Sequence, residues 1–384
     1  MFRTTLLVAL AMYASADLDI HFVNLKDVTV AMGVGFYGPT EGIFPAAFSG
    51  QIGVFKTEDA STINFEAEPI GLIPLTAAGD KKTGTAMAGG MGAVLVQTNG
   101  DWRRAEFPNP LIITQDVKNT EASGIWSVTG LFAGKQQPAI FGGVATSADD
   151  GASWQQMNIP EGTFYDNGSV RYASAPSADV MYVNAGMWAD DADTKGGLRG
   201  ASKRHHLNQR MSVDSNGKLT YADIDVEDPP VGYWAQVAKT TDGGISWSIV
   251  LDDTTGFYPN DIDCYDEDNC AMAVEGTNEG GEFGAIMITN DGGETWTTSD
   301  STMSASMMGV KMSSTTHVWG AGASPAMVGG YFLTTDGKTW DSSFTDPSDM
   351  IALITSVDFD GNDDPWGAGM KRTQISCIIH GERG

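Results

Sequence analysis

The residues best suited to bind a ligand form a basic segment in an otherwise acidic chain. The sequence of 384 residues has a formal net charge of −27, so a cluster of cations stands out against its average. The cluster comprises Lys195, Arg199, Lys203, Arg204, His205, His206 and Arg210. Cationic side chains bind carboxylate and sulfate groups, so the segment predicts a site for an anionic group. The alternative is that these charges pair with acidic surface of the same protein.

Two acidic stretches, residues 263–268 and 358–364, are the second candidates for chemistry. Carboxylates can bind calcium or catalyse glycoside hydrolysis. The second stretch has its glycine at the wrong step for a calcium loop, so we interpret both as solvated turns between first and second strands, on one rim. Adjacent His205 and His206 would point to opposite faces of a strand, which disfavours zinc. The sequence therefore predicts no metal and no cofactor, and it selects no catalytic pair.

A short phrase that recurs four times indicates the elements that carry these segments. Its pattern is Ser/Thr-x-Asp-x-Gly-x-Ser/Thr-Trp, with the fourth copy one residue shorter. The aspartates and tryptophans are Asp149 and Trp154, Asp242 and Trp247, Asp291 and Trp296, and Asp336 and Trp340. Glycine accepts a positive φ, while the aspartate and hydroxyl groups can bond the backbone. We therefore interpret each copy as a structural turn between third and fourth strands.

The phrase resembles the Asp-box, or BNR repeat, of sialidases, sortilin-type receptors, xyloglucan-cleaving enzymes and photosystem II assembly-factor-like proteins. The last group is most similar in size and single-propeller layout, and residues 270–276 and 317–322 look like its repeats. That resemblance implies a non-catalytic scaffold for protein partners. The arginine-rich patch of that group is not evident here. The sialidase family's Arg-Ile-Pro phrase is also absent, and no arginine occurs between Arg3 and Arg103, which disfavours sialidase activity.

The spacing of the phrase predicts an all-β fold, a single seven-bladed β-propeller of four-stranded antiparallel blades with Asp-box turns. Copies lie roughly 40–55 residues apart, which matches one blade. The gap between Trp154 and Trp247 is about double, so we expect an insertion in blade four at about residues 188–230, with a projecting hairpin at Asn216-Gly217. Six or eight blades are the alternatives. The last blade shows three clear strands, and the mature N-terminus is expected to close it or to begin blade one.

The N-terminus and the cysteines predict the compartment. Residues 1–16 have the positive start, apolar run and small-residue cleavage site of a secretory signal peptide, with a first strand as the alternative. The propeller then occupies residues 17–384. Cys264 and Cys270 flank a short turn and are predicted to form a disulfide, whereas Cys377 is expected to be a buried thiol rather than an intermolecular partner. Asn167 begins a glycosylation sequon. We expect a protein that is secreted or in the lumen of the secretory pathway.

These features predict a secreted, monomeric, non-catalytic scaffold for a protein or glycan. The favoured contact residues are Lys203, Arg204, His205, His206 and Arg210. An acidic surface repels nucleic acid and anionic membranes, and no second hydrophobic segment predicts membrane insertion. The alternative is a secreted glycoside hydrolase, sialidase-like or other, with carboxylates near the central channel. Converging carboxylates with an aromatic platform would favour hydrolysis, whereas a plugged or apolar channel mouth would favour binding.

Overall fold

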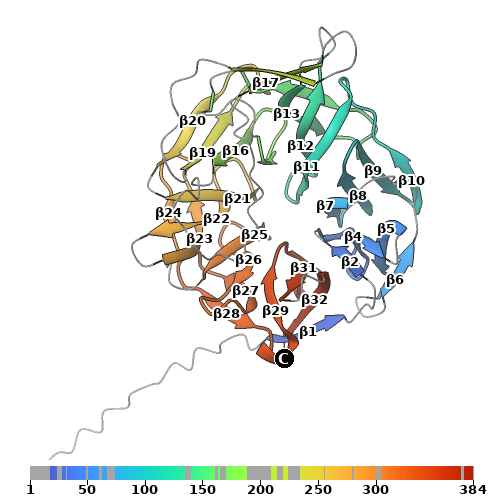
Figure 1. The fold of residues 1–384 in the computed structure, drawn as a ribbon, viewed down its shortest axis with the longest axis vertical. Helices are drawn as coiled ribbons and strands as arrows, with labels where there is room; N and C mark the ends of the chain where they lie inside the picture. Colours follow the sequence, from blue (N-terminus) through green and yellow to red (C-terminus); the bar gives the residue numbers. More distant parts are fainter. Residues whose placement is uncertain are drawn as a thin grey trace, which may run out of the picture.

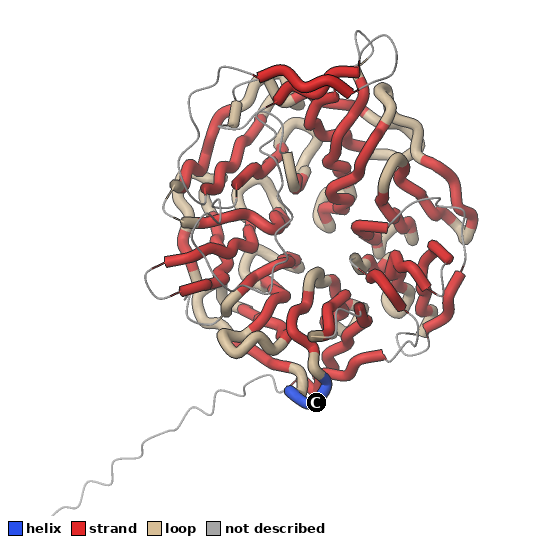
Figure 2. Tube along the Cα trace, viewed as in Figure 1, coloured by secondary structure: helices blue, strands red, loops and turns tan. Residues whose placement is uncertain are grey.

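The computed structural model is a ring of seven four-stranded antiparallel sheets (Figure 1). It describes residues 18–23, 28–31, 33–48, 51–59, 63–66, 74–134, 140–160, 163–164, 170–187, 209–213, 219–223, 234–254, 256–278, 281–299, 304–372 and 376–383. Nearly all regular structure in this part is strand, and the exception is the short 3₁₀ turn η1 (Pro347–Asp349) (Figure 2). The prediction of a seven-bladed β-propeller is confirmed.

The first three blades follow the chain from the inner to the outer strand. Blade one contains β2 (Val28–Ala31), β3 (Gly35–Phe36), β4 (Gly42–Phe48), β5 (Gln51–Thr57) and β6 (Ile63–Glu66). Blade two contains β7 (Pro74–Asp80), β8 (Thr85–Gly90), β9 (Ala93–Thr98) and β10 (Asp101–Arg104). Blade three contains β11 (Leu111–Thr120), β12 (Ile125–Ala133), β13 (Ile140–Ser147) and β14 (Gln155–Asn158).

The next three blades repeat this order. Blade four contains β15 (Tyr172–Ser174), β16 (Met181–Met187), β19 (Trp234–Thr240) and β20 (Ser248–Asp253). Blade five contains β21 (Phe257–Cys264), β22 (Cys270–Asn278), β23 (Gly281–Thr289) and β24 (Thr297–Thr298). Blade six contains β25 (Ser306–Met312), β26 (Val318–Ala323), β27 (Gly329–Thr334) and β28 (Asp341–Phe344).

Blade seven joins the two ends of the chain. Its inner strands are β29 (Ile351–Ile354) and β30 (Asp358–Phe359), followed by β31 (Pro365–Lys371) and β32 (Ser376–Arg383). The fourth strand is β1 (Leu18–Val23), which pairs antiparallel with β32 from Leu18 opposite Arg383 to Val23 opposite Ile378. The N-terminal strand therefore closes blade seven, and this pairing protects an edge that would otherwise be open.

The connections within a blade fall into two sets. First-to-second and third-to-fourth connections lie at one end of an antiparallel sheet, and second-to-third connections lie at the other end. We call the first end the turn face and the second the loop face. The long connection from β16 to β19 is a second-to-third connection and contains the hairpin of β17 (Gln209–Val213) and β18 (Leu219–Asp223). In Figure 1, β17 lies beside β13 of blade three, in agreement with their contacts.

The core is divided among the interfaces between blades. Seven clusters of buried apolar side chains occur in the described residues, and each joins two neighbouring blades. The cluster between blades seven and one, for example, packs Trp366 and Ile378 against Phe36 and Phe44. Each blade contributes apolar side chains to the clusters on both of its faces, because successive side chains of a strand point to opposite sides of a sheet. Hydrophobic packing thus holds every blade against the next.

The four repeated phrases form turns between third and fourth strands with one pattern of hydrogen bonds. In blade five, the Thr289 hydroxyl donates to Asp291 Oδ1 (2.8 Å) and accepts from the Gly293 N–H (2.9 Å). The same carboxylate accepts from the Thr295 N–H and hydroxyl. Equivalent bonds surround Asp149, Asp242 and Asp336. The tryptophan of each phrase packs into, or against, an inter-blade cluster.

Replacing Thr289 with valine is expected to destabilise the fold by about 1–3 kcal/mol. Valine keeps the shape of the side chain, which is only 1% exposed, but it leaves the buried Gly293 N–H without its acceptor. Urea unfolding measures the change. Thr298→Val is the matched control because Thr298 is exposed on β24, and an equal loss in both variants would contradict the role of the Thr289 hydroxyl.

The cysteines agree with the expectations from the sequence. Cys264 ends β21, Cys270 begins β22, and the two are cross-strand partners joined by a disulfide. Cys377 is a buried free thiol on β32. A search of the described residues finds no helix of the length and apolarity needed to span a bilayer.

Candidate functional site: a polar network at the propeller axis

The inner strands carry the side chains that meet at the propeller axis. In six of the seven blades, the inner strand has a β-bulge near its start. A bulge places two residues opposite one and redirects the side chains that follow it. Thr76 in blade two, Asp116 in blade three and Asp261 in blade five each come directly after such a register shift. The bulges therefore position the polar residues of this region.

Several inner-strand side chains accept hydrogen bonds from the backbone of the next blade. Each inner strand has a partner on one edge only, so N–H groups on its other edge need acceptors. Asp263 Oδ2 accepts from the Met312 N–H (2.8 Å), and Asp358 Oδ2 accepts from the Phe36 N–H (2.7 Å). The same kind of bond occurs at four further places, where the backbone N–H groups of Val117, Ala175, Cys264 and Val310 donate to the side chains of Thr76, Thr120, Ser174 and Asp261, respectively. These polar groups thus join neighbouring blades.

Two lysines connect blades that are not neighbours. Lys118 of blade three lies with its Nζ 2.5 Å from Asp261 Oδ1 and donates to the Ile262 carbonyl (2.7 Å), both in blade five. Lys311 of blade six donates to the Asn119 carbonyl of blade three (3.1 Å) and lies 3.8 Å from Asp263 Oδ2. We call Asp116, Lys118, Asp261, Asp263 and Lys311 the axial network. These side chains connect the inner strands of blades three, five and six.

Burial and neighbouring charges set the protonation states of the axial network. Burial raises the pKa of Asp116 to about 7, although Lys118 opposes the shift. Burial also raises the pKa of Asp263. For Lys118, burial favours the neutral form, but the charges of Asp261, Asp263 and Asp116 outweigh it and raise the pKa. Asp263 and Asp358 likewise outweigh the effect of burial on Lys311 and raise its pKa, so both lysines stay charged, whereas Asp116 titrates near neutral pH.

Two buried oxygens of the axial network have no hydrogen-bond partner. They are Asp116 Oδ2 and Asp263 Oδ1, in residues that are 8% and 1% exposed. A protonated Asp116 is consistent with this environment, since a neutral carboxyl is less costly to bury than a charged one. The other oxygen of Asp116 accepts from the Thr76 hydroxyl, and the other oxygen of Asp263 accepts from the Met312 N–H.

Each end of the axis has a further charged group against an aromatic ring. Toward the turn face, Lys81 Nζ lies 3.5 Å from the ring centroid of Phe359, and burial lowers the pKa of Lys81. Where the inner strands begin, the Arg171 guanidinium lies 5.0 Å from the Tyr258 ring centroid. Cations over aromatic faces are attracted by the ring quadrupole.

A separate surface hollow of about 550 Å³ lies on the outer side of blade six, lined by Ser324, Val328 and residues 342–347.

The favoured contact residues from the sequence belong to the insertion in blade four. Lys203, Arg204, His205 and His206 lie outside the described residues, as do the glycosylation site Asn167 and the predicted signal peptide. Arg210 lies on β17, where its backbone pairs with Ala222. The insertion therefore leaves the propeller on the loop face, opposite the repeat turns. Its use for binding stays a prediction.

The sequence singles out Asp263, as part of an acidic stretch, but not the other four residues of the axial network. A usable signal was present, because Asp116 and Lys118 alternate on one inner strand, as Asp261 and Asp263 do on another. Side chains two residues apart on a strand point the same way, so the two pairs could face each other across the axis. The acidic stretches around residues 263–268 and 358–364 do join first and second strands, as expected. The interpretation of both stretches as solvated turns is wrong for Asp263, Asp358 and Asp360, which are buried because they accept hydrogen bonds from backbone or indole N–H groups.

The fold defines this chain as a seven-bladed β-propeller. No protein-family model and no curated protein matches the sequence. Among solved structures, it resembles an oligogalacturonate lyase from Vibrio parahaemolyticus, with a TM-score of 0.52 and 8% identity over 95% of this chain and 97% of that one.

Two further solved structures that match this chain are also enzymes. The GH74 xyloglucanase from Xanthomonas campestris has a TM-score of 0.50 and 12% identity, with 94% of this chain and 55% of that one covered. The Trypanosoma rangeli sialidase has a TM-score of 0.33 and 12% identity, with 74% and 56% covered. At such low identity the comparisons extend to the fold and no further.

Proposed function

We propose that this protein is a secreted Asp-box β-propeller that acts as a non-catalytic binding scaffold for a protein or glycan. The observation that carries the proposal is that Lys118 and Lys311 join the inner strands of blades three, five and six. These lysines and backbone N–H groups engage Asp261 and Asp263, so the carboxylates serve the joining of blades. Glycoside hydrolysis needs two carboxyl groups that face the sugar from either side.

Three other features support this proposal. The hydrogen bonds shared by the four repeat turns are those that an Asp-box requires in order to act as a structural turn. The disulfide between Cys264 and Cys270 suits an oxidising compartment, as does the leader at residues 1–16. The basic segment belongs to the long connection between β16 and β19, and long loops on a rigid scaffold commonly bind ligands.

One observation favours the alternative, a secreted glycoside hydrolase. Asp116 is a carboxyl group with a pKa raised to about 7, which is the protonation behaviour required of a general acid. It lies on the same inner strand as Lys118 and two residues before it. A hydrolase would use Asp116 as the acid and a second axial carboxylate as its partner.

A glycan-array screen of the secreted protein distinguishes the two functions. Positive glycans are incubated with the protein and examined for cleavage products. Binding without turnover supports the scaffold, and cleavage that disappears in Asp116→Asn supports the hydrolase. Absence of both binding and cleavage directs the search to protein ligands by affinity capture with cross-linking.

The combined replacement of Arg204, His205 and His206 with alanine is expected to abolish binding of an anionic ligand. The thermal midpoint should stay nearly unchanged, because charges in a surface insertion contribute little to stability. Arg104→Ala is the control, since Arg104 is an exposed cation on β10 of blade two. A large fall in the thermal midpoint with intact binding would instead support pairing of the basic segment with acidic surface.

A further inference from the structure

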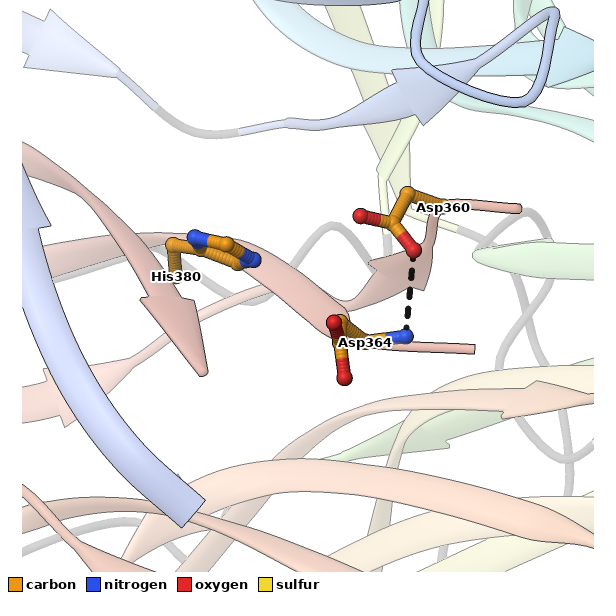
Figure 3. A group of neighbouring side chains, drawn as sticks. All are labelled: Asp360, Asp364 and His380. Carbon is orange, nitrogen blue, oxygen red and sulfur yellow. Dashed lines mark hydrogen bonds between the residues drawn. The ribbon is translucent and has the colours of Figure 1, made fainter. Parts of the chain in front are cut away.

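Blade seven brings together a histidine and two aspartates from different elements. Asp360 and Asp364 lie in the connection between β30 and β31, and His380 lies on β32. One ligand atom from each residue lies within 4.8 Å of those of the other two. Figure 3 shows the imidazole of His380 extending toward the two carboxyl groups. Among the described residues, no other set of three or more histidine, cysteine, aspartate or glutamate side chains has its ligand atoms this close together.

Surrounding contacts fix two of the three side chains. The His380 ring stacks on Trp366 with centroids 3.8 Å apart, and His380 Nδ1 lies 3.7 Å from Glu382 Oε1. Trp366 Nε1 donates to Asp360 Oδ2 (3.3 Å). Histidines that bind metals through one nitrogen commonly have a carboxylate beside the other, and Glu382 takes that place here. Asp360 and His380 are 2% and 8% exposed, so both are held in a protected position.

The backbone of the loop also orients Asp360. The N–H groups of Asn362 and Asp364 donate to Asp360 Oδ1 at 2.8 and 3.2 Å. Each carboxylate oxygen has two acceptor positions, so Oδ2 retains capacity for a cation beside its bond from Trp366. Asp364 is partly exposed, and one of its carboxylate oxygens lies within 4.8 Å of a ligand atom of each of the other two residues.

We propose that Asp360, Asp364 and His380 form a binding site for one divalent transition-metal cation, for which Zn²⁺ is the probe. Zinc takes carboxylate oxygen and imidazole nitrogen at about 2.0–2.2 Å, which requires donors about 3–3.5 Å apart. The ligand atoms lie within 4.8 Å of one another in the structure, so binding would draw them closer together. A nitrogen donor with two oxygens favours Zn²⁺ over Ca²⁺, which prefers oxygen ligands alone.

The position of the site indicates a structural role. His380 lies on the strand that pairs with the N-terminal strand β1, and Asp360 lies in the loop from the inner strand. A cation held by both links the inner and third strands of the blade that closes the ring. Binding to the folded chain alone raises stability as the ligand concentration exceeds its dissociation constant. This inference is independent of the ligand of the basic segment.

Zinc titration of the secreted, metal-stripped protein tests the site. Calorimetry is expected to give one Zn²⁺ per chain, and a Zn²⁺ concentration one hundredfold above the dissociation constant should raise the thermal midpoint by several degrees. His380→Gln and Asp364→Asn are each expected to weaken binding by at least about tenfold. Asp364→Asn carries the test if His380→Gln fails to fold, since Asp364 lies partly in solvent.

Two controls come from the same chain. His317 lies on the turn face of blade six, with its Nε2 2.9 Å from Asp363 Oδ2, and Trp319 Nε1 donates to the other oxygen of Asp363. This group resembles the proposed site in having a histidine, an aspartate and a tryptophan, but it has one carboxylate instead of two. His317→Gln should leave zinc binding unchanged, and so should replacement of His205 and His206 with glutamine. The proposal fails if the intact protein shows no zinc-induced shift, if Asp364→Asn and His380→Gln bind as well as the parent, or if either control removes the site.

Discussion

Replacing Lys118 with alanine is expected to lower the free energy of unfolding by about 3–5 kcal/mol, which is the usual cost of removing one partner from a buried ion pair. The Lys118 ammonium lies 2.5 Å from Asp261 and donates to the Ile262 carbonyl across the axis. Its loss leaves the Asp261 carboxylate and that carbonyl without their shared partner, in a region that water enters poorly. Urea unfolding of the parent and variant measures the difference.

A double-mutant cycle separates the ion pair from the volume of the side chain. Lys118→Met keeps the aliphatic part and removes the charge, and Asp261→Asn keeps an oxygen that can accept from the Val310 N–H. The combined variant should recover most of the stability lost in Lys118→Met, because neither charge then remains buried alone. Lys338→Ala, at an exposed position, should change stability by less than about 0.5 kcal/mol. A similarly small effect of Lys118→Ala would contradict the axial network.

The repeat predicted most of the fold because it marks a local element. Each Asp and Trp pair identifies a turn between third and fourth strands, so the spacing from Trp247 to Trp296 to Trp340 follows the blades. The sequence does not determine which strand closes the ring, since β1 and β2 are both strand-like and the choice between them depends on pairing with β32. That pairing joins the two ends of the chain, and no local pattern in the sequence determines it.

The candidate site was harder to predict than the fold for a related reason. Lys118 and its partner Asp261 are 143 residues apart, and the sequence does not show that their strands face each other across the axis. The basic segment attracted attention because its charges are consecutive. Buried ion pairs instead place one charge on each of two strands among apolar neighbours, so each residue taken alone resembles ordinary surface.

Stability is expected to fall as pH rises from about 5 to about 8, because of Asp116. Burial raises its folded pKa to about 7 from the ordinary aspartate value of 3.8, so over this range the folded state holds a proton that the unfolded state has released. The contribution is fully present below the unfolded pKa and is lost as pH rises through the folded pKa. For a shift of this size the loss over that window is about 2–3 kcal/mol. Asp263 acts with the same sign, since burial also raises its pKa.

Asp116→Asn isolates the contribution of Asp116 from that of the other titratable groups. The amide keeps an oxygen to accept from the Thr76 hydroxyl, now 2.9 Å from Asp116 Oδ1, and cannot ionise. Its free energy of unfolding should therefore vary less between pH 5 and pH 8 than that of the parent, with the largest gain in relative stability at pH 8. Urea unfolding at several pH values gives both curves. Parallel curves would mean that Asp116 is ionised throughout, and the protonated carboxyl at the propeller axis would have to be abandoned.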